Sequence, residues 1–242
     1  MEPLPVITWK WGDKFSPEYV NKLKSMVKRH LTIPHYFACL CEDSKGLDKD
    51  IIKIPMFYYN NALPGALKEE GCLRRLKMFS PEFETLFGEK FLHIDLDSII
   101  CGDITKLIQE ANGLKIWKST SYGRKKYALN PSFVLINFKD PNTSLVWDIF
   151  NKDKKYINRI FKKIKRGSFL GSDQRIISYI LHDKNVETWD NDDGFYSIRD
   201  QANLLKGSLP ENAKYIGFFG CRKQTNSRFS SGGFSWIRSN WN

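Results

Sequence analysis

The stretch Phe91-Leu92-His93-Ile94-Asp95-Leu96-Asp97-Ser98-Ile99-Ile100 decides the fold of this chain. Its apolar run ends in two carboxylates one residue apart, and this pattern is typical of a buried strand that delivers Asp95 and Asp97 to its carboxyl end. Successive side chains of a strand point to opposite faces, so Asp95 and Asp97 are expected on the same side of the sheet. Open α/β sheets bind ligands at the carboxyl ends of their strands. The two carboxylates are therefore candidates for a ligand site.

These two carboxylates predict a metal site with oxygen ligands only. Mg²⁺ and Mn²⁺ prefer such ligands and bind phosphate oxygens beside one or two carboxylates. We therefore expect Asp95 and Asp97 to hold Mn²⁺ or Mg²⁺ together with a diphosphate. The alternative is an acidic turn after a purely structural strand. Two unpaired carboxylates against so apolar a run would be costly, which favours the ligand site.

The composition favours one globular domain spanning residues 1–242. The chain has 242 residues, of which 41% are hydrophobic and 27% charged, enough to bury a sizeable core. A net charge of +11 favours an anionic partner, which is a nucleotide, a nucleic acid or a lipid head group. The five cysteines lack the paired spacing of a zinc site and are expected to be reduced thiols. Without a signal peptide or a long apolar run, the protein is expected to be soluble and cytoplasmic.

The segments on either side of the Asp95 run predict alternating strands and helices. Before it, strands at 6–9 and 35–41 flank a helix that starts after Ser16, with Pro17 at its first position, and this βαβ order implies parallel pairing. Further strands are expected at 52–55, 115–118, 133–137 and 215–220. Further helices are expected at 73–79, 104–111 with Asp103 as N-cap, 142–150, 156–166 and from 171 onward.

Four segments in this order resemble a nucleotide-sugar glycosyltransferase of the GT-A type. Val6-Ile7-Thr8-Trp9-Lys10-Trp11-Gly12 resembles the first strand and loop, which hold the nucleobase and ribose in that fold. A basic helix with Arg75 precedes Asp95-Leu96-Asp97, as it precedes the DxD motif of those enzymes. Leu129–Asn137 resembles their acceptor-side strand, and Gly171-Ser172-Asp173-Gln174 resembles the start of their D-Q helix. The resemblance implies an α/β, GT-A (Rossmann-like) fold, with a mixed, mostly parallel central sheet flanked by helices.

The resemblance also implies an activity and a role for each site residue. The expected activity is transfer of a sugar from a UDP or GDP sugar to a hydroxyl of a glycan, with a divalent metal on Asp95 and Asp97. Asp173 is expected to orient the acceptor hydroxyl or to act as base, although a helix cap is an alternative role. Asn130 and Gln174 are expected to bind acceptor hydroxyls, and no histidine is assigned a role. The expected nucleotide-binding residues are Thr8, Trp9, Lys10, Trp11, Arg75, Asp95 and Lys223.

One position departs from the pattern of the metal-dependent relatives. Their late strand often ends in a histidine that is a third metal ligand, and Phe219 takes that place here. The metal is then expected to be held by the two aspartates, the diphosphate and water, or to be partly replaced by the positive charge of Arg222 or Lys223. Metal dependence therefore follows less directly from the sequence than the fold does.

Other functions remain as alternatives. A haloacid dehalogenase-like phosphatase also uses an Asp-x-Asp pair, with residues 190–193 as a second acidic cluster, but its pair normally follows the first strand. A sugar nucleotidyltransferase needs a Gly-rich phosphate loop that residues 8–13 do not form. A nucleic-acid-binding protein fits the charge, but no recognition motif occurs. The basic region 152–166 is either a solvated helix face or a contact with an acidic acceptor, a membrane surface or nucleic acid.

Overall fold

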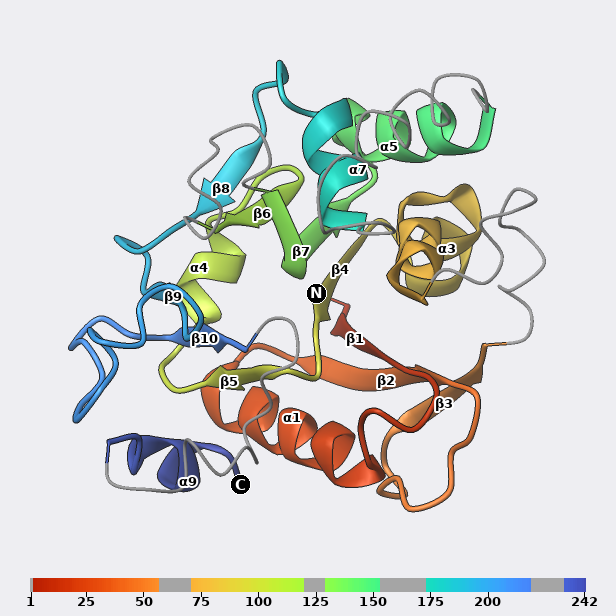
Figure 1. Cartoon of the computed structure of the whole chain (residues 1–242). Coiled ribbons are helices and arrows are strands. Elements are labelled where there is room, and N and C mark those ends of the chain that lie inside the picture. Colours follow the sequence, from red (N-terminus) through yellow and green to blue (C-terminus); the bar gives the residue numbers. More distant parts are fainter. Residues whose placement is uncertain (1, 57–70, 120–128, 153–172, 219–232) are drawn as a thin grey trace.

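The computed structural model describes residues 2–56, 71–119, 129–152, 173–218 and 233–242, and the strands of this part form two sheets. The strands of the larger sheet lie in the order β3-β2-β1-β4-β7-β6-β8 (Figure 1). Neighbours pair in parallel except at β7, which is antiparallel to both β4 and β6. The predicted mixed, mainly parallel sheet is thus confirmed. The seven strands are β1 (Leu4–Lys10), β2 (His35–Cys41), β3 (Ile52–Pro55), β4 (Lys90–Ile94), β6 (Lys115–Lys118), β7 (Leu129–Asn137) and β8 (Glu187–Trp189).

Strand β4 ends at Ile94, so Asp95 and Asp97 follow its carboxyl end as predicted, and the chain then enters a smaller sheet. Its strands are β5 (Ser98–Ile100), β10 (Tyr215–Gly217) and β9 (Phe195–Ser197), in that order. Strand β4 ends before Asp95, whose N–H donates to the carbonyl of Ser132 in the larger sheet. The carbonyl of Asp97 instead accepts from the N–H of Phe218, directly after β10. The two aspartates therefore lie in a bend where the chain passes from one sheet to the other.

Helices cover both faces of the larger sheet. In Figure 1, α1 and α9 lie on one side, and α3, α5 and α7 lie on the other. The alternation along β1 explains this arrangement, because Val6 packs into the core cluster that contains α1, whereas Ile7 and Trp9 pack into the cluster that contains η2 and α3. The helices are α1 (Pro17–His30), η2 (Gly71–Phe79), α3 (Pro81–Phe87), α4 (Thr105–Gln109), α5 (Pro141–Lys152), α7 (Asp173–Ile180) and α9 (Trp236–Asn240).

The predicted helix starts hold at α1 and shift at α4. Helix α1 begins at Pro17 after Ser16, as predicted, although the Ser16 side chain makes no capping hydrogen bond. Helix α4 begins at Thr105, so Ile104 rather than Asp103 occupies the cap position. Asp103 lies one residue earlier, and its Oδ1 accepts a hydrogen bond from the N–H of Thr105 at 2.8 Å. The carboxylate therefore forms a local turn that leads into the helix.

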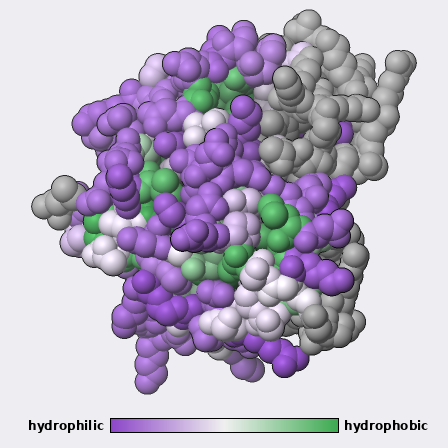
Figure 2. Space-filling model, turned by 90° about the vertical axis from the view of Figure 1, so that its left-hand side faces the viewer, coloured by the Kyte–Doolittle hydropathy of each residue, from purple (hydrophilic) through white to green (hydrophobic). Residues whose placement is uncertain are grey.

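The end of the chain packs against α1. Trp236 and Trp241 are buried, and the Trp241 ring lies 4.9 Å from that of Tyr19. The Arg29 guanidinium donates to the carbonyls of Asn240 and Asn242, at 2.8 and 2.6 Å. Figure 2 shows that the side of the molecule bearing α9 and the smaller sheet is mostly hydrophilic, with apolar groups in small, separate areas. Among the described residues, no helix has the length and apolar character needed to cross a membrane.

Candidate active site

The candidate site lies at the carboxyl ends of β1 and β4. The strands leave this point in both directions, since β2 and β3 lie beyond β1, while β7, β6 and β8 lie beyond β4. Such a change of direction opens a crevice at the carboxyl edge of a sheet, where ligands of α/β proteins bind. Three described segments meet at this edge, because η2 contacts the loop after β1 through Arg74 and Trp11 and the bend at residues 95–97 through Arg75 and Asp95.

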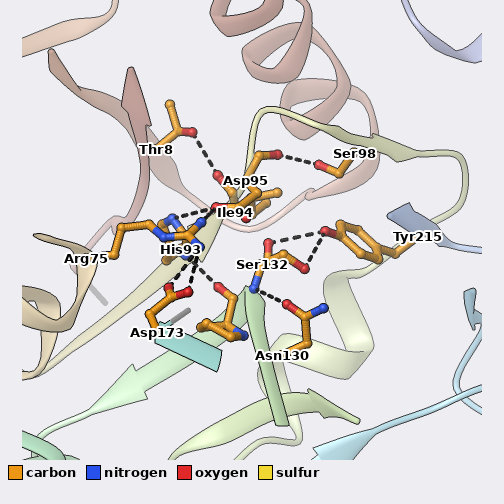
Figure 3. A network of polar contacts seen from close by, with 11 residues as sticks. Thr8, Arg75, His93, Ile94, Asp95, Ser98, Asn130, Ser132, Asp173 and Tyr215 are labelled. Carbon is orange, nitrogen blue, oxygen red and sulfur yellow. Dashed lines mark hydrogen bonds and ion pairs between the residues drawn. The ribbon is translucent and has the colours of Figure 1, made fainter. Parts of the chain in front are cut away.

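The main chain around Asp95 is held by hydrogen bonds from three directions (Figure 3). The hydroxyl of Thr8 donates to the carbonyl of Ile94 at 2.8 Å, and the hydroxyl of Ser98 donates to the carbonyl of Asp95. The carbonyl of Ser132 accepts from the Asp95 N–H at 2.8 Å and also from the Tyr215 hydroxyl at 3.2 Å. The main chain of Asp95 is therefore fixed by the fold itself. Thr8, predicted to bind nucleotide, is fully buried and uses its hydroxyl in this network.

Arg75 joins two carboxylates that are far apart in the sequence (Figure 3). Its Nη1 donates to Oδ1 of Asp95, and its Nη2 lies 2.8 Å from Oδ2 and 3.0 Å from Oδ1 of Asp173. Burial alone would lower the pKa of Arg75, but the charges of Asp173 and Asp95 raise it well above its usual value. Burial raises the pKa of Asp173, and Arg75 opposes that shift. The guanidinium thus brings η2, the end of β4 and the start of α7 together, as a buried ion pair with both acids.

His93 is a residue of the site that sequence reasoning missed. Its side chain is fully buried, its Nδ1–H donates to the carbonyl of Pro131 at 2.9 Å, and its Nε2 lies 3.4 Å from Oδ1 of Asp95. Burial lowers the pKa of His93 to about 4, and the charge of Asp95 only partly opposes that shift. The ring is therefore neutral at pH 7, with its proton on Nδ1, and its Nε2 faces Asp95 without a hydrogen bond among the described residues. Its position two residues before Asp95, on the same face of the strand, was the available signal.

The site opposes ionisation of Asp97. Burial, followed by the negative charge of Asp95, raises the pKa of Asp97 to about 7, and the charges of Lys14 and Arg75 only partly offset this. Among the described residues, Asp97 forms no ion pair. A divalent cation would remove the repulsion between the two acids, so the pair fits Mn²⁺ or Mg²⁺. No set of three His, Cys, Asp or Glu in the described ranges is arranged around a metal.

The residues at the end of β1 differ in their exposure. Trp9 is 4% exposed and stacks on Phe83 with ring centroids 5.6 Å apart, so its indole belongs to the core. Lys10 is also buried. Trp11 is only partly buried, and the Arg74 guanidinium lies 5.4 Å from the centre of its ring. Of the two tryptophans predicted to contact a base, Trp11 is the one with exposed surface.

The predicted acceptor-binding residues lie on β7 and α7, which are bonded to each other. The hydroxyl of Ser178 on α7 makes 3.1 Å hydrogen bonds with both the N–H and the carbonyl of Leu129 on β7. Asn130 follows Leu129, is 5% exposed, and accepts from the N–H of Ser132 through Oδ1 at 3.0 Å. Gln174 is 9% exposed beside Asp173. The predictions for Lys223, Arg222, Phe219 and all of the basic region 152–166 except Lys152 lie outside the described residues.

Comparisons with known proteins agree with this architecture. No protein family and no curated protein matches the chain by sequence. Among solved structures, the chain is similar to the galactosyltransferase LgtC in complex with donor and acceptor sugar analogues, with a TM-score of 0.62 and 15% identity over 98% of this chain and 94% of that one. An active-site mutant of LgtC matches with a TM-score of 0.60 and 14% identity over the same shares. These likenesses establish the fold.

Proposed function

We propose that this protein transfers a sugar from a UDP or GDP sugar to a hydroxyl of a glycan, with Mn²⁺ or Mg²⁺ bound at Asp95 and Asp97. The observation that carries the proposal is the environment of Asp97, whose pKa rises to about 7 beside Asp95 in a site rigidly held by the fold. Two adjacent carboxylates without a bridging cation are suited to a divalent metal with phosphate oxygens. The likeness to a sugar transferase supports the same assignment.

The side chains around Asp95 suggest a role for each group of the site. A metal bound there would neutralise the leaving nucleoside diphosphate. Arg75 holds Asp95 and Asp173 in one arrangement, so both carboxylates keep their positions before substrate arrives. Since both oxygens of Asp173 lie within 3.0 Å of the guanidinium, its proposed role is to orient the acceptor hydroxyl rather than to remove its proton. Asn130 and Gln174 would bind other acceptor hydroxyls.

The phosphatase alternative has less support from the structure. Its proposed second acidic cluster is a closed turn, because Oδ2 of Asp193 and Oδ1 of Asp190 accept hydrogen bonds from N–H groups of the same turn, each at 3.0 Å. The Asp95 pair also follows β4 rather than the first strand. Both observations favour sugar transfer.

Calorimetric titration of the whole chain with UDP, GDP and their sugars, with and without Mn²⁺, tests the proposal. We expect one nucleoside diphosphate to bind, to require Mn²⁺, and to lose that binding in Asp97→Ala. Asp183→Ala is the control, because Asp183 is an exposed aspartate whose ion-pair contacts are to His182 and Lys184. Absence of nucleotide binding under every condition would contradict the proposal, as would metal-dependent hydrolysis of sugar phosphates that nucleotides do not inhibit.

A further inference from the structure

Two adjacent thiols lie on one face of β2, and the proposed sugar transfer uses neither of them. Cys39 and Cys41 are separated by one residue, so their side chains point to the same side of the sheet. Both belong to the core cluster that contains α1, where Cys39 is fully buried and Cys41 is 4% exposed. The two thiols are hydrogen-bonded to each other. Because β2 ends at Cys41 and an exposed loop begins at Glu42, the pair lies beside the protein surface.

Lysines from both neighbouring strands flank this pair. In the ladder, Lys10 of β1 pairs with Cys41, and Lys53 of β3 pairs with Cys39. Adjacent strands lie about 4.8 Å apart and paired residues share a face, so both lysine side chains leave the sheet beside the thiols. Lys10 is buried and Lys53 is exposed. Nearby cations and an S–H donor favour the thiolate form of a cysteine, which is its nucleophilic form.

These surroundings divide the charge unequally between the two thiols. The hydrogen bond from Cys39 lowers the pKa of Cys41 to about 7; burial opposes this shift, and the charges of Lys10 and Lys53 support it against that of Asp43. The same hydrogen bond and burial raise the pKa of Cys39 well above its ordinary value. At neutral pH the pair therefore consists of a partly ionised Cys41 and a protonated Cys39 that donates to it.

Two other described cysteines have the opposite tendency. Burial raises the pKa of both Cys72 and Cys101 to about 12, so these thiols are neutral at pH 7. Both nevertheless have more exposed surface than Cys41. Exposure and ionisation thus predict opposite orders of reactivity for these three cysteines, and ionisation favours Cys41.

We infer that Cys41 is a site of oxidation by a hydroperoxide, and that Cys39 resolves the product to a disulfide. The Cys41 thiolate attacks one peroxide oxygen, so an S–O bond forms, the O–O bond breaks, and the other oxygen leaves and takes a proton from water. The Cys39 sulfur then attacks the sulfenic acid, so an S–S bond forms and the hydroxyl leaves as water with the Cys39 proton. The two thiols lose two electrons, and the peroxide gains them.

The position of the pair makes this oxidation reversible and connects it to a neighbouring loop. Residues i and i+2 of a strand have Cα atoms about 6.6 Å apart, close to the upper limit of about 6.8 Å for a disulfide. Closing the bond therefore bends the end of β2, and such strained disulfides are readily reduced. Glu42 follows Cys41 directly and accepts from the N–H of Gly12 at 3.0 Å. The bend therefore loosens the loop after β1.

Alkylation of the whole reduced chain by iodoacetamide, followed by peptide mass spectrometry, tests the ionisation of Cys41. We expect Cys41 to react at least roughly 10-fold faster than Cys72 and Cys101 at pH 7, with a rate that rises between about pH 6 and pH 8. Earlier labelling of Cys72 or Cys101 would overturn the inference, because exposure rather than ionisation would then decide the order.

Hydrogen peroxide is the probe for the oxidation itself. In wild type the peptide that carries both thiols should lose two hydrogens and regain them with dithiothreitol, while hydrogen exchange at residues 11–13 becomes faster and then recovers. In Cys39→Ala dimedone should instead trap a sulfenic acid on Cys41, and Cys101→Ala should behave as wild type. A wild-type pair that stays reduced, or a disulfide that leaves exchange at residues 11–13 unchanged, would overturn the inference. These readouts need no nucleotide, so failure of the proposed function leaves this inference standing.

Discussion

Asp97 should make the ligand-free protein less stable as the pH rises, and Asp97→Asn should remove that effect. The pKa of Asp97 is about 7 in the fold, mainly because of burial and then because of Asp95, compared with an ordinary value of 3.8. When folding raises the pKa of a carboxyl, ionisation of that carboxyl lowers the free energy of unfolding. The unfolded chain releases this proton at a lower pH, so the loss of stability begins above pH 3.8 and is complete above about pH 7.

The size of the effect follows from this shift. One pKa unit corresponds to about 1.4 kcal/mol, so a rise of about three units corresponds to about 4 kcal/mol at high pH. About 2.5 kcal/mol of this develops between pH 5 and pH 8, because part is already present at pH 5. Asp97 is partly exposed, and screening by solvent reduces the expected change to about 1–1.5 kcal/mol. Asn and a protonated Asp also differ in their contribution to the free energy of unfolding by an amount that does not vary with pH. Comparing pH 5 with pH 8 cancels this amount.

Urea unfolding in EDTA at pH 5, 6, 7 and 8, followed by circular dichroism, measures this effect. The free energy of unfolding of Asp97→Asn relative to wild type should rise by about 1–1.5 kcal/mol from pH 5 to pH 8. Asp183→Asn, at an exposed position, should show no such trend. Mn²⁺ should then stabilise the wild type at pH 8 and leave Asp97→Asn unchanged. A difference between wild type and variant that does not vary with pH would refute the reasoning.

Three further predictions concern other parts of the chain. Arg75→Met should cost about 3–5 kcal/mol in urea unfolding, since the buried Asp173 and the partly buried Asp95 lose their partner; a loss below 1 kcal/mol would contradict a stabilising ion pair with Asp173. Thr8→Val should cost about 1–2 kcal/mol by leaving the Ile94 carbonyl unpaired, with nucleotide affinity unchanged in titration; a large loss of affinity would instead assign the hydroxyl to the ligand. Trp241→Ala should lower the free energy of unfolding by about 2–3 kcal/mol, because the packing on Tyr19 is lost. Calorimetric unfolding measures this loss, and an unchanged stability of the variant would contradict a contribution of the C-terminal segment.

The sequence alone determined most strands and helices, because their signals are local. The strands at 35–41, 52–55 and 115–118 have the predicted bounds, since alternating apolar side chains and the flanking turn residues are readable within a few positions. The start of α1 at Pro17 follows from Ser16 and Pro17 in the same way. The order of these elements and the resemblance also predicted the mixed sheet. They pointed to the Asp95 stretch as the place of the candidate site.

Only the tertiary structure decided which side chains meet. Arg75 and Asp173 are 98 residues apart, and their contact depends on η2 and α7 lying on the same face of the sheet. The chain bends at residues 95–97 because the Asp95 N–H bonds to Ser132 on β7, whereas the Asp97 carbonyl bonds to Phe218 after β10. A local sequence pattern cannot reveal either of these distant partners. The burial of Trp9 likewise depends on α3, because Phe83 of that helix stacks on its ring. Periodicity reports the face of an element, whereas the partner on that face is set by packing between distant segments.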